Sequence, residues 1–288
     1  MWGRHPNLLI LDSVSWSTSR DKIVGHGLTL VVLALLSLAF LEACTDTCET
    51  DVYVFPVQPG SREWATFRTH GEMVAACQVP EPILRDMSTE GLIETCLSYP
   101  LIGDMGAYNS WQQGLDRVAA RFNGLQELLR RPDVGTELLA RYRQMDPAGI
   151  QEKGTSLQRG QYAIEFQHVE MLLAQRGVLS SMTVAERRDL LAECLEKSRS
   201  KEPPGYGVVD VAYTAWVMGR ILVMDAPGHL GLEERTGSEL AYFVEEGSLK
   251  AYCLCASIWP VAGVGVQCCT GELPSPGKCT AEAHTCLV

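Results

Sequence analysis

The amino-acid sequence predicts an all-α fold, either a multi-helix bundle or a HEAT-like helical stack, over residues 65–250. Apolar residues recur there at intervals of three and four, which is the spacing of a buried helix face. Several segments begin with Thr or Ser followed three residues later by Glu, a signal for a helix start. Alternation typical of a strand hardly occurs outside residues 51–57. Helices of ordinary length joined by short loops pack as a bundle or a stack.

Residues 1–43 are interpreted as an N-terminal extension plus a signal peptide. The stretch 28–41 is 14 residues long and carries no charge. A membrane-spanning helix needs about 20 apolar residues, whereas the core of a secretory signal needs about 7 to 15. Leu41, Ala43 and Cys44 resemble the lipobox of bacterial lipoproteins, although Glu42 is unusual there. We therefore predict lipidation at Cys44, with an ordinary cleaved signal or an uncleaved anchor as the alternatives.

Residues 44–64 are expected to form an acidic, extended tether between the lipid and the helical domain. Asp46, Glu49 and Asp51 resemble the acidic signals that direct lipoproteins to the outer face of an outer membrane. The Pro and Gly residues that follow them disfavour a helix. The predicted location is therefore an exported one, at the outer membrane or the cell surface, with the membrane as a partner through the lipid anchor.

N-terminal caps mark several of the predicted helices. In a capping box, a Thr side chain and a Glu side chain three residues later each accept a hydrogen bond from the other residue's backbone amide. Such boxes are predicted at Thr69–Glu72, Thr183–Glu186 and Thr236–Glu239, the last one opening a helix that runs to about Glu246. Ser88 or Thr89 is expected to cap the helix through residues 92–97.

Three longer helices are predicted from apolar stripes. The stripes consist of Trp111, Leu115, Val118 and Phe122; of Tyr162, Phe166, Val169 and Leu173; and of Val184, Leu191 and Leu195 with Leu190 and Cys194 beside them. Shorter helices are expected at 124–131 and 134–145, where Pro132 and Pro147 interrupt the helical pattern.

The segment 208–224 is apolar on nearly every side, interrupted mainly by Asp210, Thr214, Gly219 and Arg220. Its length is marginal for a membrane span, and its two charges disfavour one. We interpret it as the buried central helix of the domain, because loops containing Pro and Gly flank it. Asp210 and Arg220 are ten residues apart and are not expected to pair along the helix.

The phrases AACQVPEPIL, MSTEGLIETCLSYPL, AYNSWQQG and RFNGLQELL fall within residues 71–134. This region resembles an uncharacterised helical domain that follows signal peptides in secreted and lipoprotein chains of anaerobic gut bacteria. The resemblance implies export and an all-α fold, and it implies no particular activity. The long N-terminal extension and the cysteine-rich end depart from the pattern of that family.

Cysteines fall into two groups. Cys77, Cys96 and Cys194 lie on apolar faces of predicted helices and are expected to be buried hydrophobic thiols, with a disulfide as the alternative. The tail, residues 251–288, has little helix or strand pattern, and we expect it to be poorly ordered. Its six cysteines fit three disulfides, a zinc site with His284, or a non-native tail; they are Cys253, Cys255, Cys268, Cys269, Cys279 and Cys286.

The common catalytic motifs do not occur, and we predict no catalytic residue, cofactor or metal site. His70 is placed in a capping turn, and His168 and Glu170 are spaced so that they point apart on a helix. The pairs Glu233-Glu234 and Glu245-Glu246 are interpreted as solvated carboxylates.

Two groups of side chains suggest recognition. The first, Tyr99, Tyr108, Asn109 and Trp111, suits carbohydrate or peptide contacts, with aromatic core packing and an Asn109 helix cap as the alternative. The second is a run of six arginines, interpreted as a solvated helix face rather than a phosphate groove: Arg117, Arg121, Arg130, Arg131, Arg141 and Arg143.

Composition limits the function. The chain has 288 residues, 46% of them hydrophobic, and a formal net charge of -11, which argues against disorder and against a nucleic-acid partner. We predict an envelope lipoprotein whose helical domain binds a protein or a glycan while the lipid holds it at the membrane. The alternative is a secreted hydrolase whose catalytic residues lie far apart in the sequence.

Overall fold

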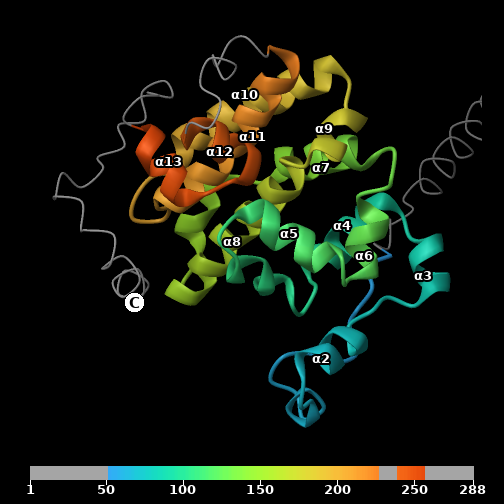
Figure 1. The fold of residues 1–288 in the computed structure, drawn as a ribbon. Helices are drawn as coiled ribbons and strands as arrows, with labels where there is room; N and C mark the ends of the chain where they lie inside the picture. The colour runs from blue at the N-terminus through green and yellow to red at the C-terminus, as the bar shows by residue number, and fades with distance from the viewer. Residues whose placement is uncertain (1–50, 227–238, 257–288) are drawn as a thin grey trace, which may run out of the picture. The chain divides into compact units, whose positions relative to one another are not determined.

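A computed structural model describes residues 51–226 and 239–256, and every regular element in these ranges is a helix (Figure 1). The predicted all-α fold is confirmed. Within the described ranges, none of the helices combines the length and the hydropathy that crossing a membrane requires. Cys44, the box at Thr236 and the tail beyond residue 256 lie outside the described residues.

The elements follow one another along the chain with short connections. Three are 3-10 helices: η1 (Trp64–Thr66), η2 (Ile102–Ala107) and η3 (Pro147–Glu152). The first α-helices are α2 (His70–Ala76), α3 (Glu81–Asp86), α4 (Thr89–Leu97), α5 (Trp111–Ala119), α6 (Asn123–Leu128) and α7 (Val134–Gln144). They are followed by α8 (Ser156–Leu173), α9 (Arg176–Ser181), α10 (Val184–Ser200), α11 (Val208–Asp225), α12 (Glu239–Glu246) and α13 (Leu249–Ala256).

The predicted caps at Thr69 and Thr183 are present. In each box the Thr hydroxyl accepts from the amide three residues later, at 3.2 Å, and the Glu carboxylate accepts in return. Ser88 caps α4 by accepting from the amide of Gly91. These local bonds satisfy amides that the helix itself leaves without a partner.

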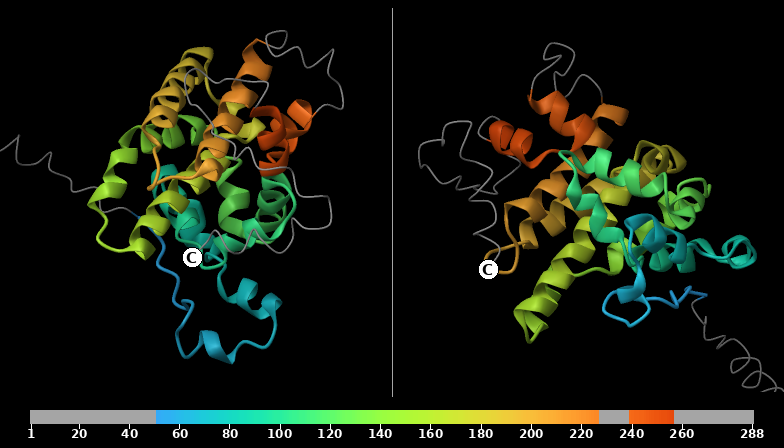
Figure 2. Two further views of the ribbon diagram at one scale, coloured as in Figure 1. Left: turned by 90° about the vertical axis from the view of Figure 1, so that its left-hand side faces the viewer. Right: turned by 60° about the horizontal axis from the view of Figure 1, so that its bottom comes forward.

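Helix α11 is the buried helix predicted at 208–224. It packs against α8, α10 and α12, and Figure 2 shows it between these neighbours from two directions. Trp216 has no exposed surface, and its indole N–H donates to the carbonyl of Val244 at 3.0 Å. The two charges do not pair with each other: Asp210 accepts from Gln167, whereas Arg220 bonds to backbone carbonyls.

The Arg220 guanidinium joins the C-terminal ends of two helices. Its Nη1 donates to the carbonyl of Ala174 at 2.8 Å, directly after α8. Its Nε donates to Val244 at 2.9 Å and its Nη2 donates to Glu245, both in the last turn of α12. A cation at this end of a helix also interacts favourably with the helix dipole.

The described part of the expected tether packs on the domain instead of extending into solvent. Phe55 is buried against the rings of Tyr99 and Phe122, and the backbone amide of Tyr53 donates to Thr95 at 2.9 Å. The packed part of the chain therefore includes residues before 65, where the domain was expected to begin. An aromatic side chain that fits the core outweighs the local preference for an extended linker.

The packed chain also continues beyond residue 250, where the poorly ordered tail was expected to start. Helix α13 extends to Ala256, and Ala251 and Tyr252 are buried. The ring of Tyr252 lies 5.3 Å from that of Phe243. The rest of the expected tail, residues 257–288, lies outside the described residues.

The stripe expected on α10 is centred on Leu190 and Cys194 rather than on Val184, Leu191 and Leu195. Val184 is 47% exposed, and Leu191 and Leu195 are only partly buried, whereas Leu190 and Cys194 are fully enclosed. The buried face also carries three polar side chains, Arg187, Lys197 and Ser198. Charged residues can occupy a core face when each finds partners there.

Cys77, Cys96 and Cys194 are buried and free, as expected for hydrophobic thiols. Burial raises the pKa of all three thiols. They therefore stay protonated at neutral pH and are poor nucleophiles.

Candidate functional site

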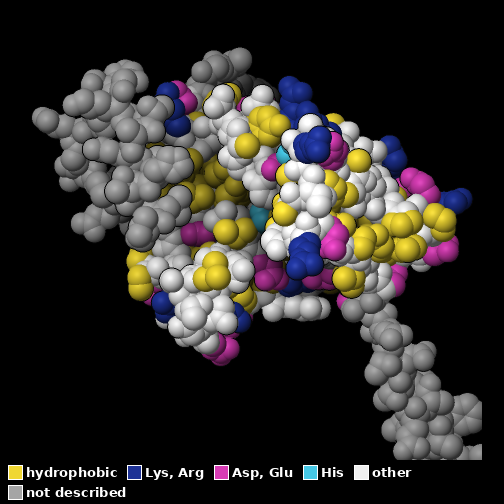
Figure 3. All heavy atoms as spheres, turned by 90° about the horizontal axis from the view of Figure 1, so that it is seen from below, with side chains coloured by type: hydrophobic (Ala, Val, Ile, Leu, Met, Phe, Trp, Pro, Cys, Tyr) yellow, Lys and Arg dark blue, Asp and Glu magenta, His cyan; other side chains and the backbone are white. Residues whose placement is uncertain are grey.

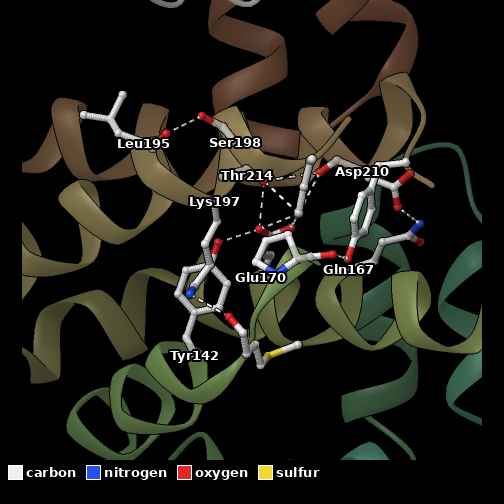
Figure 4. Close-up of polar contacts among 12 residues, drawn as sticks. Tyr142, Gln167, Glu170, Leu195, Lys197, Ser198, Asp210 and Thr214 are labelled. Atoms are coloured by element: carbon white, nitrogen blue, oxygen red, sulfur yellow. Dashed lines mark hydrogen bonds and ion pairs between the residues drawn. The ribbon is translucent and has the colours of Figure 1, made fainter. Parts of the chain in front are cut away.

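The most extensive polar cluster lies inside the domain and not at its surface (Figure 4). Glu170 of α8 accepts from Tyr142 of α7 at 2.7 Å and from Thr214 of α11 at 2.8 Å. The ammonium of Lys201, just after α10, donates to both Glu170 oxygens at 2.8 Å. Because Glu170 and Lys201 have no exposed side-chain surface, no substrate reaches them. The cluster joins four parts of the fold and is a structural element.

A surface pocket with different chemistry lies between α2, η2 and α5. Its volume is about 290 Å³, near the lower end of the size range of small-molecule sites. The lining residues are His70, Val74, Tyr99, Asp104, Ala107, Tyr108, Arg117, Val118 and Arg121. They combine apolar walls with several polar groups, which is the usual composition of a ligand site. We refer to it as the η2 pocket.

His70 and Asp104 form one side of the η2 pocket. The Nε2 atom of His70 lies 2.6 Å from Oδ2 of Asp104, and both side chains are partly exposed. His70 is the first residue of α2, held there by the Thr69 cap, and Asp104 lies in η2. A carboxylate in this position accepts from Nε2–H and so fixes the tautomer and the orientation of the ring. The Oδ1 atom of Asp104 makes no hydrogen bond to any residue that the structure describes.

Two arginines also line the pocket. Arg117 lies in the last turn of α5, and Arg121 lies in the turn directly after that helix. Both are exposed, and neither forms an ion pair within the described ranges. Their charge is therefore available to an anion in the pocket.

Tyr99 forms the inner wall of the pocket. Its side chain is only 2% exposed, and its ring stacks on Phe122 with the ring centroids 3.9 Å apart. Burial, together with the nearby Cys77 and Asp104, raises the pKa of its phenol, which therefore stays protonated at neutral pH. The hydroxyl makes no hydrogen bond to any described residue. Because its oxygen is not enclosed by protein, the hydroxyl can bond to water or to a ligand in the pocket.

Helix α5 approaches η2 closely enough to form the pocket because residue 114 is glycine. A Cβ atom at Gly114 would lie 2.0 Å from the carbonyl oxygen of Met105.

Ser110 caps α5 by accepting from the amide of Gln113 at 3.2 Å. The cap expected at Asn109 is therefore wrong by one residue.

The pocket brings together residues that the sequence analysis considered separately. His70 was assigned to a capping turn, Tyr99 and Tyr108 to an aromatic group, and Arg117 and Arg121 to a basic run. Trp111 of the same aromatic group lies elsewhere, stacked on Tyr213 with the ring centroids 3.8 Å apart. Asp104 was missed, because a single aspartate in a loop has no distinguishing pattern.

The other arginines of the basic run do not form one solvated face. Arg141 bonds to Glu94 and Glu165 on different helices, and Arg143 bonds to Asp189. Arg131 bonds to Glu127 at 2.7 Å. Figure 3 accordingly shows basic and acidic side chains interspersed on the face it presents, rather than a continuous basic patch. Arg131 also donates to the carbonyl of Leu84 in α3 at 3.1 Å, so Arg131, Arg141 and Arg143 connect helices. Arg130 is exposed and, like Arg117 and Arg121, forms no ion pair with a described residue.

Of the remaining candidates, Glu245 and Glu246 have structural partners, and Glu233-Glu234 lies outside the described residues. Glu245 pairs with Arg176, and Glu246 accepts from the hydroxyl of Ser110 at 2.9 Å. Burial lowers the pKa of His168 to about 4, so its ring is neutral at neutral pH. Within the described ranges, no group of three or more His, Cys, Asp or Glu side chains is arranged to hold a metal ion.

Comparison with known proteins returns no relative. No family model matches the chain, and neither curated proteins nor solved structures provide a match. The resemblance of residues 71–134 to an exported helical domain therefore stays a prediction. The η2 pocket is therefore the feature from which a function can be proposed.

Proposed function

We propose that the helical domain is a binding domain and that the η2 pocket is its ligand site. The observation that carries this proposal is the set of unpartnered donors in one cavity, namely the guanidinium groups of Arg117 and Arg121 and the hydroxyl of Tyr99. Donors without protein partners favour a bound polar ligand, because a ligand atom then replaces only water. The ligand is a small molecule or the end of a peptide or glycan, since the cavity is small.

We further propose that a lipid on Cys44 tethers this domain at the outer membrane or cell surface. The support is in the sequence, in the uncharged stretch 28–41 followed by the lipobox-like residues at 41–44. Packed residues are described from residue 51 onward, so at most a few residues would separate the domain from the lipid. Mass spectrometry of the mature N-terminus tests this directly. A diacylglycerol mass on Cys44 that is absent in Cys44→Ala supports the tether, and an unmodified full-length N-terminus contradicts it.

Binding can be tested without knowing the ligand. The full chain, purified in detergent, is applied to arrays of glycans and peptides beside a double variant, Arg117→Gln with Arg121→Gln. Because charge-assisted hydrogen bonds contribute about 1.5–3 kcal/mol each, we expect the double variant to bind the same ligand at least tenfold more weakly. Arg130→Gln is the matched control, because Arg130 is exposed and forms no ion pair with a described residue. Equal binding by all three proteins would place the ligand elsewhere.

One observation favours the alternative, a secreted hydrolase. The His70–Asp104 pair has the arrangement in which a carboxylate orients an imidazole that acts as a general base on water. The two readings differ in the effect of His70→Gln. A hydrolase would lose turnover of its bound ligand while retaining affinity, whereas a binding domain has no turnover to lose.

A further inference from the structure

We propose that the η2 pocket recognises a hydroxylated carboxylate, the chemistry of an acidic sugar residue. This inference rests on the proposed function, because it names the ligand class of the same site. It follows from the combination of three kinds of group in one cavity: paired cations, a free carboxylate oxygen and an exposed aromatic ring.

The cations select an anion. Arg117 of α5 and Arg121 of the following turn both line the pocket and have no acidic partner in the described structure. A guanidinium presents its N–H donors in a planar fork that matches the two oxygens of a carboxylate. The lining carries two guanidinium groups and one carboxylate, whereas the chain as a whole has a net charge of -11. The hydroxyl of Tyr99 adds one neutral donor at the inner wall.

The carboxylate of Asp104 makes the pocket favour a hydroxy acid over a phosphate ester. His70 occupies its Oδ2 atom, and Oδ1 remains without a partner among the described residues. A carboxylate oxygen that lines an anion site accepts hydrogen bonds from ligand hydroxyls and repels a dianion. An aspartate at this position would weaken the binding of a phosphate ester, because the two negative groups repel each other. A singly charged ligand with neighbouring hydroxyl groups satisfies both Asp104 and the arginines.

The aromatic and aliphatic walls suit the body of a sugar ring. Tyr108 lines the pocket and is 36% exposed, which is a large exposed fraction for an aromatic side chain. Val74, Ala107 and Val118 provide apolar surface around it. The C–H face of a pyranose ring is apolar and packs on such a surface, while its hydroxyl groups point to the rim.

Three related ligands test the assignment. Glucuronate, glucose and glucose 6-phosphate share one ring and differ in charge at a single carbon. We expect ligand-observed NMR titrations of the full chain in detergent to show saturable binding of glucuronate, with at least tenfold weaker binding of the other two. Preferential binding of the phosphate ester or equal binding of glucose would overturn the inference.

Variants tie the binding to the pocket. Arg121→Gln should weaken glucuronate binding at least tenfold, and Tyr99→Phe should weaken it severalfold by removing only the hydroxyl. Arg130→Gln should leave it unchanged, and thermal melts monitored by circular dichroism should show all variants folded. Glucuronate binding that survives in Arg121→Gln would overturn the inference.

The outcomes also separate this inference from the proposed function. If an arrayed ligand of another class binds and depends on Arg117 and Arg121, the function stands and the acidic sugar is wrong. If neither the arrays nor the three sugars give binding that depends on these arginines, both are wrong.

Discussion

The ammonium of Lys201 lies 2.8 Å from both carboxylate oxygens of Glu170, and neither side chain is exposed. Removing one partner of such a pair leaves an uncompensated charge in the interior, which costs about 3–5 kcal/mol. We expect Lys201→Met to lower the free energy of unfolding by about that amount. Urea denaturation followed by circular dichroism measures it.

An exposed ion pair provides the control for this prediction. Arg143 lies 2.7 Å from Asp189 and 3.8 Å from Glu193, and the Arg143 and Asp189 side chains are about half exposed. Arg143→Met removes the same charge but should change the free energy of unfolding by less than about 1 kcal/mol. If Lys201→Met and Arg143→Met lowered the free energy of unfolding by similar amounts, the prediction that the enclosed pair contributes more would be wrong.

The N-terminal segment should contribute to stability through Phe55. Its ring is buried beside Tyr99 and Phe122, and truncating a buried Phe costs about 3–5 kcal/mol. Phe55→Ala should therefore lower the thermal midpoint by several degrees, whereas Val54→Ala, at a site that is 79% exposed, should not. Identical melting of both variants would mean that residues 51–57 are a tether after all.

Gly114 should be intolerant of a side chain. A Cβ atom there would lie 2.0 Å from the backbone oxygen of Met105, which cannot move without displacing η2. Gly114→Ala should cost at least about 2 kcal/mol in urea denaturation, as expected for overpacking against backbone. Gly106→Ala, in η2 itself, meets no atom within 4 Å and should be close to neutral. The prediction fails if Gly114→Ala is as stable as Gly106→Ala.

His168 should make the fold sensitive to mild acid. Burial lowers its pKa to about 4, whereas an unfolded histidine has a pKa of about 6.5. Between these values the unfolded chain takes up the proton and the folded chain does not, so stability falls as the pH falls from 6.5 towards 4. The full difference is about 3 kcal/mol, and His168→Gln should remove it. Urea midpoints measured across this window should vary less in the variant, and equal slopes would disprove the role of His168.

Local features were predictable from the sequence because their causes are local. The caps at Thr69 and Thr183 need only a residue three positions away, and the segment at 208–224 is apolar on nearly every side. The buried face of α10 was not predictable in this way. Arg187 bonds to Asp225 and Lys197 bonds to the carbonyl of Met145, and both partners are distant in the chain. Without knowledge of its partner, a charged residue is expected from the sequence to face the solvent.

The η2 pocket was predictable only in pieces. His70, Tyr99 and Arg121 each stood out by residue type, but their meeting depends on how α2 and α5 pack around η2. That packing depends on Gly114, whose importance comes from a contact with a residue outside its own helix. Asp104, the partner of His70, carried no signal at all.

Arg220 binds α8 and α12 through main-chain oxygens only. Every residue type except proline presents the same carbonyl geometry in the last turn of a helix, so this attachment does not depend on which side chains stand at 244 and 245. The outer surface of α12 is therefore free to change its chemistry over evolutionary time while the helix keeps its position, provided that the one guanidinium is retained.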